Sequence, residues 1–113
     1  MERFKTAGTR EIEAYEAICA LSEKMLSVAK GGEWESIASI EKKRAQLIQQ
    51  VRDLSKKSLL NNDAVTRKVD LIQRILAADS ETKSCVQSRM KQLKTGFHTE
   101  RTLLKTYGNK VLS

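Results

Sequence analysis

The sequence has no proline and only one histidine among its 113 residues. Because proline is the strongest breaker of helix interiors, its absence leaves room for long continuous helices. No run of about 18 consecutive apolar residues occurs, so we expect no transmembrane helix. The first residues lack the apolar core of a signal peptide, and we therefore expect a cytoplasmic protein that does not bind membranes.

Residue groupings that carry out catalysis or bind metals are also missing. His98 is the only histidine, and the sequence has no glycine-rich phosphate loop, HExxH, CxxC or acidic calcium loop. Cys19 and Cys85 each lie in a helical apolar pattern, which predicts reduced, buried thiols. We therefore expect no enzymatic activity, no catalytic residue, no metal and no cofactor.

Apolar residues instead recur at spacings of three and four, as in amphipathic helices. The first predicted helix covers 9–30, with Thr9 as its cap and Glu11 and Glu13 in its first turn. Gly31 and Gly32 follow, and a second helix is predicted over 33–57. A connection this short implies that the two helices fold back as an antiparallel hairpin.

A third helix is predicted over 63–95, with Asp63 as its cap and Gly96 as its end. Its apolar stripe consists of Val65, Val69, Ile72, Leu76, Val86 and Leu93. The helix either breaks near Asp79 or runs on past its shorter neighbours. We favour a continuous helix, because neither glycine nor proline interrupts the sequence there.

A short fourth helix is predicted over 98–112, with Leu103, Leu104, Tyr107 and Val111 on its apolar face. The predicted fold is therefore an all-α antiparallel bundle of three long helices plus this short C-terminal helix. We expect one domain over 1–113, in which 1–8 are a flexible N-terminus. The fourth helix is close to the length below which isolated helices melt, so it can act as a removable cover.

Without catalytic chemistry, the expected activity is protein binding. We predict a groove for an amphipathic partner helix on the second and third helices, formed by Arg44, Leu47, Val51, Val69, Ile72 and Leu76. Arg44 occupies an apolar position of its stripe, with Glu41 one turn away, and is expected to extend its charged end outward. Trp34 is expected to close one end of the bundle.

Two stretches of the sequence, 25–37 around Trp34 and 71–79 before and including Asp79, resemble the FliT family of flagellar export chaperones. The first is 25–37, in which Gly32-Glu33-Trp34-Glu35 is the most specific part, followed by Ile40, Glu41 and Arg44. The second is 71–79, in which Ile75-Leu76 precedes Asp79. Leu93 and Tyr107 also fall where the family tends to carry Leu and Tyr. Glu35 departs from the family's commoner Asp but keeps the charge, and the resemblance covers roughly residues 12–107.

The resemblance implies a cytoplasmic chaperone that holds the filament cap protein FliD and delivers it to the flagellar type III export apparatus. It also implies contacts with the export ATPase complex and export gate components. Some members bind the flagellar transcription regulator FlhDC, and in some the last helix restrains binding. The FlgN-type chaperones of the hook-filament junction proteins are similar helical proteins and remain an alternative.

The charge distribution suggests other functions. Residues 83–113 carry seven of the 21 lysines and arginines but only one of the 14 acidic residues. A basic nucleic-acid-binding or regulatory protein is therefore an alternative, although aromatic residues for base stacking are scarce and no direct nucleic-acid contact is expected. A homodimer is also left open, because helical stripes this broad can be buried between two copies.

Overall fold

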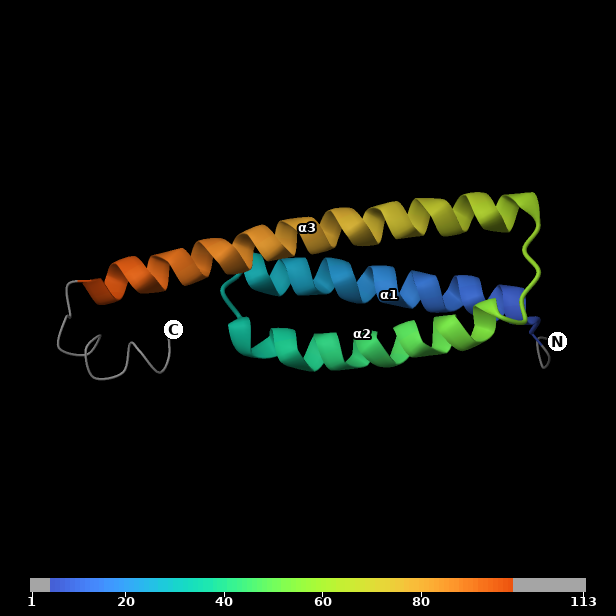
Figure 1. Cartoon of the computed structure of the whole chain (residues 1–113), viewed down its shortest axis with the longest axis horizontal. Coiled ribbons are helices and arrows are strands. Elements are labelled where there is room, and N and C mark those ends of the chain that lie inside the picture. Colours follow the sequence, from blue (N-terminus) through green and yellow to red (C-terminus); the bar gives the residue numbers. More distant parts are fainter. Residues whose placement is uncertain (1–4, 99–113) are drawn as a thin grey trace. The chain divides into compact units, whose positions relative to one another are not determined.

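The computed structural model describes residues 5–98, with side chains described to Lys94. It contains three helices, α1 (Ala7–Lys30), α2 (Trp34–Ser55) and α3 (Asn62–His98), as Figure 1 shows. The predicted all-helical fold with three long helices is confirmed for this part of the chain. The residues of the predicted fourth helix, Leu103, Leu104, Tyr107 and Val111, lie outside the described residues.

The helix ends depend on side-chain caps that differ from those predicted. α1 begins two residues before Thr9, because the Thr6 hydroxyl accepts a hydrogen bond of 3.1 Å from the Thr9 backbone N–H. α3 begins one residue before Asp63, because the Asn61 side chain accepts a bond of 2.8 Å from the Ala64 N–H. α3 then continues through both Asp79 and Gly96, so the predicted end at Gly96 is wrong.

Gly32 makes the turn between α1 and α2. Its φ of 75° lies in the left-handed region, which glycine adopts without the steric penalty that a side chain imposes. Backbone hydrogen bonds from Gly32 to Ala29 and from Glu33 to Val28 close the end of α1. The hairpin predicted from the two glycines is therefore formed.

The chain divides into two compact units, Met1–Thr82 and Lys83–Ser113. In the first unit α1 packs against both α2 and the first part of α3 (Figure 1). One core cluster consists of Ala14, Ile18 and Val51, and a second, nearer the glycine turn, consists of Met25, Val28 and Ile40. α1 contributes to both clusters and is the central helix of this unit.

Two apolar stripes run along the first part of α3, and the structure buries the one that the sequence pattern did not single out. Leu71 is 1% exposed, and Ala78 and Thr82 are buried on the same face. Val65, Val69 and Leu76, from the predicted stripe, are exposed, Leu76 by 62%. The predicted stripe is therefore not the core-facing side of this part of α3.

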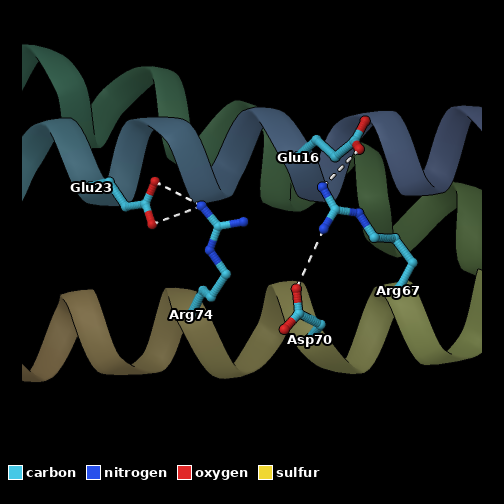
Figure 2. Close-up of polar contacts among 5 residues, drawn as sticks. All are labelled: Glu16, Glu23, Arg67, Asp70 and Arg74. Carbon is cyan, nitrogen blue, oxygen red and sulfur yellow. Dashed lines mark hydrogen bonds and ion pairs between the residues drawn. The ribbon is translucent and has the colours of Figure 1, made fainter.

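Ion pairs along the edge of the α1–α3 interface agree with this rotation of α3 (Figure 2). Glu16 pairs with Arg67 at 3.1 Å, and Glu23 pairs with Arg74 at 3.0 Å. Both pairs join residues 51 positions apart, so the two helices run in the same direction with one register. Because these side chains are about half exposed, each pair contributes at most about 1 kcal/mol. They orient α3 more than they stabilise it.

Glu11 is a fully buried carboxylate at the start of the bundle. It accepts a hydrogen bond from the Ser58 hydroxyl in the α2–α3 connection and another, of 2.9 Å, from the Lys68 ammonium group. Lys68 also lies over the Tyr15 ring, 5.5 Å from its centroid. These contacts join α1, the connection and α3 at one point.

These contacts shift the titration of both groups. Burial alone raises the pKa of Glu11, but the hydrogen bonds from Ser58 and Lys68 and the charge of Lys68 outweigh burial, so the pKa is lowered. The hydrogen bond to Glu11 raises the pKa of Lys68, and burial opposes that change. The folded state therefore favours the charged form of both groups.

We predict that Leu71→Ala lowers the free energy of unfolding by about 2–5 kcal/mol, because it leaves a cavity in the core. Leu76→Ala removes the same atoms from an exposed position and should change the free energy by about 0.5 kcal/mol or less. Urea unfolding followed by circular dichroism measures both. Equal losses in the two variants would contradict the assignment of the buried stripe.

We predict that Glu11→Gln reduces the dependence of stability on pH in acid. A carboxylate with a lowered folded pKa stabilises the fold above its ordinary pKa of 4.5, and that contribution is lost as pH falls through the folded value. The variant should therefore be less stable than the parent at pH 7, and the gap should narrow below about pH 4.5. Urea unfolding at a series of pH values measures this gap.

Glu41→Gln, on the exposed face of α2, is the matched control and should keep the parent's acid slope. A gap between Glu11→Gln and the parent that stays constant from pH 7 to about pH 3 would refute a role for the Glu11 charge.

Candidate partner-binding groove

An apolar groove of about 330 Å³ is formed by all three helices within the first unit. α1 contributes Tyr15 and Ile18, α2 contributes Ile48, Val51 and Arg52, and α3 contributes Ile72, Ile75 and Leu76. Seven of these eight side chains are apolar or aromatic, and Arg52 is the charged member. The groove can therefore accept apolar side chains and offers one guanidinium group to a ligand.

The exposure of the lining side chains shows which part of the groove is closed and which part is open to solvent. Ile18 and Val51 are core residues, and Tyr15, Ile48 and Ile75 pack against the same cluster and are partly buried. Leu76 is largely exposed, so the α3 side is open to solvent. The base of the groove is therefore part of the buried core, whereas its α3 edge has apolar surface that a ligand could cover.

Three of the six residues predicted for this groove line it, namely Val51, Ile72 and Leu76. Leu47 packs against the core cluster of Ala14, Ile18 and Val51. Val69 lies on the exposed stripe of α3 but does not line the groove. Of the predicted residues, only Val51 on α2 and Ile72 and Leu76 on α3 therefore meet in this groove.

Arg44 has a different environment from the one predicted. Its side chain is 15% exposed, and its Nη1 donates to the Ser22 hydroxyl at 3.0 Å and to the Asp79 carboxylate. The prediction that Arg44 extends outward is wrong, because the buried Ser22 on α1 and the partly exposed Asp79 on α3 accept its hydrogen bonds. Arg44 therefore joins α2 to both α1 and α3.

Sequence reasoning missed the α1 side of the groove, Tyr15 and Ile18, and also Ile48, Arg52 and Ile75. The signal was present for Ile18, because Ala14, Ile18 and Leu21 follow the spacings of four and three that predict the first helix. Ile48 and Ile75 each neighbour a residue of the predicted stripes, Leu47 and Leu76. The sequence could not show that three helices converge at this level.

Trp34 is the first residue of α2 and is partly exposed, next to the glycine turn. The residues that pack against the neighbouring core cluster are Leu21 and Ile37. The predicted role of Trp34 in closing this end of the bundle stays a prediction.

The described residues do not form a metal site of the usual kind. No group of three or more His, Cys, Asp or Glu side chains that could hold a metal ion occurs among them. Within the same part of the chain, none of the helices has an apolar stretch of the length that crossing a bilayer requires.

Comparison with known proteins identifies a family that this chain resembles over most of its length. Residues 12–109 match the family model described as "Flagellar protein FliT". A flagellar protein FliT of Photorhabdus laumondii subsp. laumondii is 27% identical over 82 residues, which cover 73% of this chain. The matched region spans 66% of that relative, slightly less than two thirds of its length. No solved structure matches.

The family match covers most of the chain, including every residue that lines the groove. Members of this family are flagellar proteins and are not enzymes. The sequence resemblance is confirmed, and this chain belongs to the FliT family of flagellar proteins.

Proposed function

We propose that this protein is a cytoplasmic export chaperone that binds the filament cap protein FliD. In this proposal it prevents premature assembly of FliD and delivers it to the flagellar type III export apparatus. Membership of the FliT family supports the flagellar role. The single structural observation that carries the proposal is the apolar groove formed by α1, α2 and α3.

The groove suits an amphipathic client helix. Such a helix presents apolar side chains at spacings of three and four, and these side chains can enter a groove lined almost entirely by apolar residues. Burial of apolar surface contributes roughly 25 cal/mol per Å², so covering the exposed Leu76 favours binding. A client helix held in this way cannot use the same apolar face to assemble with other copies.

The proposal extends to partners that the family resemblance implies. These are the export ATPase complex, components of the export gate and, in the control of flagellar transcription, FlhDC. The groove is assigned to FliD alone, because the apolar lining is what an amphipathic client helix requires. A chaperone that binds both its client and the export apparatus needs further surface outside this groove.

We predict that Leu76→Asp weakens binding of the C-terminal segment of FliD at least tenfold, which corresponds to about 1.4 kcal/mol. A carboxylate at this edge of the groove would have to lose water when the client helix covers it. Isothermal titration calorimetry with the full chain measures the affinity.

Leu59→Asp is the matched control, because Leu59 is 94% exposed, lies in the α2–α3 connection and does not line this groove. It makes the same chemical change and should leave the affinity within about twofold, or about 0.4 kcal/mol. Equal affinities in the parent and Leu76→Asp would exclude the groove as the FliD site. An absence of binding by the parent itself would overturn the choice of client.

The proposal includes restraint of client binding by residues 98–112. We predict that the double substitution Leu103→Asp and Tyr107→Asp raises the affinity for the FliD segment about tenfold, because it removes apolar side chains that compete for the same surface. Ser113→Asp also adds a negative charge after Gly96 without removing an apolar side chain, and should leave the affinity unchanged. Unchanged or weaker binding by the double variant would refute the restraint.

A further inference from the structure

The part of α3 after Thr82 differs in charge from the part before it. Residues 83–94 include Lys83, Arg89, Lys91 and Lys94 and contain no aspartate or glutamate. In the first part, the cations Arg67, Lys68 and Arg74 each pair with a glutamate of α1. The basic character of 83–94 is therefore not balanced by acids within the same segment.

The same segment also carries exposed apolar surface. Val86 and Met90 are exposed, Met90 by 47%, and Leu93 is partly buried. Their spacings of four and three put them on one face of the helix. At about 100° per residue, Lys83 and Lys94 lie within roughly 40° of Met90 around the helix axis. The three apolar residues and the two lysines that adjoin them, here called the basic stripe, form one continuous surface.

The composition of the basic stripe distinguishes between ligand classes. Contacts with nucleic-acid phosphates require cations but no apolar stripe, and 83–94 contains no aromatic residue for base stacking. Interfacial membrane helices carry a wide apolar face with bulky anchors such as Trp or Phe. A narrow heptad-like stripe next to lysines is instead the pattern that helices use to pair with helices of opposite charge.

We propose that the basic stripe is a docking surface for an acidic amphipathic helix of a partner protein. The partner helix would cover Val86, Met90 and Leu93 with its own apolar residues. Its glutamates or aspartates would pair with Lys83 and Lys94 along the edge of the contact. Charge complementarity therefore selects the occupant, and apolar contact supplies most of the affinity.

The chain's own C-terminal residues do not have the charge that this surface requires. Residues 99–113 carry Arg101, Lys105 and Lys110 against Glu100 alone, so they are basic as well. The basic stripe also shares no residue with the apolar groove, whose lining lies between Tyr15 and Leu76. An experiment can therefore distinguish a lack of FliD binding at the groove from a lack of partner binding at the basic stripe.

The test measures binding of a labelled acidic peptide to the full chain by fluorescence anisotropy. The peptide is helical, with leucine at the a and d positions of its heptads and glutamate at the flanking positions. We expect Lys83→Glu with Lys94→Glu to weaken binding at least tenfold. Lys42→Glu with Lys43→Glu, a pair of exposed α2 lysines, makes the same change in net charge and should have an effect of about twofold or less.

Met90→Ser tests the apolar part of the contact and should weaken binding several-fold at unchanged net charge. Lys83→Gln with Lys94→Gln repeats the test without charge reversal, and circular dichroism checks that each variant keeps its helix content. Equal losses from the α2 and α3 lysine pairs would overturn the proposal, because the attraction would then be unspecific. An unchanged affinity of Met90→Ser would also overturn it.

Duplex DNA and phosphatidylglycerol vesicles are the competing ligands. Tighter binding of either one than of the peptide, lost on reversal of Lys83 and Lys94, would assign the surface to nucleic acid or to membranes and reject the acidic helix. We expect both to bind more weakly than the peptide and to be lost at high salt, because phosphate contacts are screened.

Discussion

The position of α3 on α1 depends on a carboxylate that cannot be buried alone. Glu11 is fully buried, and an unpaired charge in that position would be unfavourable by several kcal/mol. Ser58 and Lys68 must therefore reach it, which brings the α2–α3 connection and the first turns of α3 to the start of α1. The Glu16–Arg67 and Glu23–Arg74 pairs continue the same register along the helices.

This register determines which side of α3 is available for binding. With Lys68 at Glu11, the face that contains Leu71 and Ala78 turns inward, and the face that contains Val69 and Leu76 remains exposed. Near Leu76 that exposed face meets α1 and α2 and completes the apolar groove. Farther along, Asp79 accepts the Arg44 hydrogen bond and joins α3 to α2. The groove is thus a consequence of polar contacts outside it.

The sequence was sufficient to predict α1, α2 and the hairpin that they form, because their signals are local. Apolar spacing identifies α1, and the two glycines identify its turn into α2. α3 was more difficult, because two apolar stripes, one through Leu71 and one through Leu76, fit the same helical period. Only long-range partners such as Glu11 and Lys68 decide between them, and such pairs cannot be read from one helix. The cap residues Thr6 and Asn61 were missed because Thr9 and Asp63 are equally good caps locally.

The candidate site shows the same division between local and long-range information. Val51, Ile72 and Leu76 were predicted because each belongs to a stripe, and the groove contains them. Tyr15 and Ile18 belong to α1, and their presence in the groove depends on how three helices meet. From the sequence alone, Arg44 has Glu41 as its neighbour, because residues three positions apart adjoin on a helix. The acceptors that it uses, Ser22 and Asp79, lie on two other helices.

Exposed apolar side chains are distributed unequally, and this indicates which helix has apolar surface left for a partner. Among the described residues the large hydrophobic side chains that remain exposed are Leu59 in the connection and five on α3, namely Val65, Val69, Leu76, Val86 and Met90. α1 has none, because it packs on both α2 and α3 and contributes to both core clusters. A helix that is covered on both sides can hold a bundle together but has little apolar surface for a ligand. α3 combines one buried stripe with one exposed stripe, so it can stay attached to α1 while its other face contacts a partner.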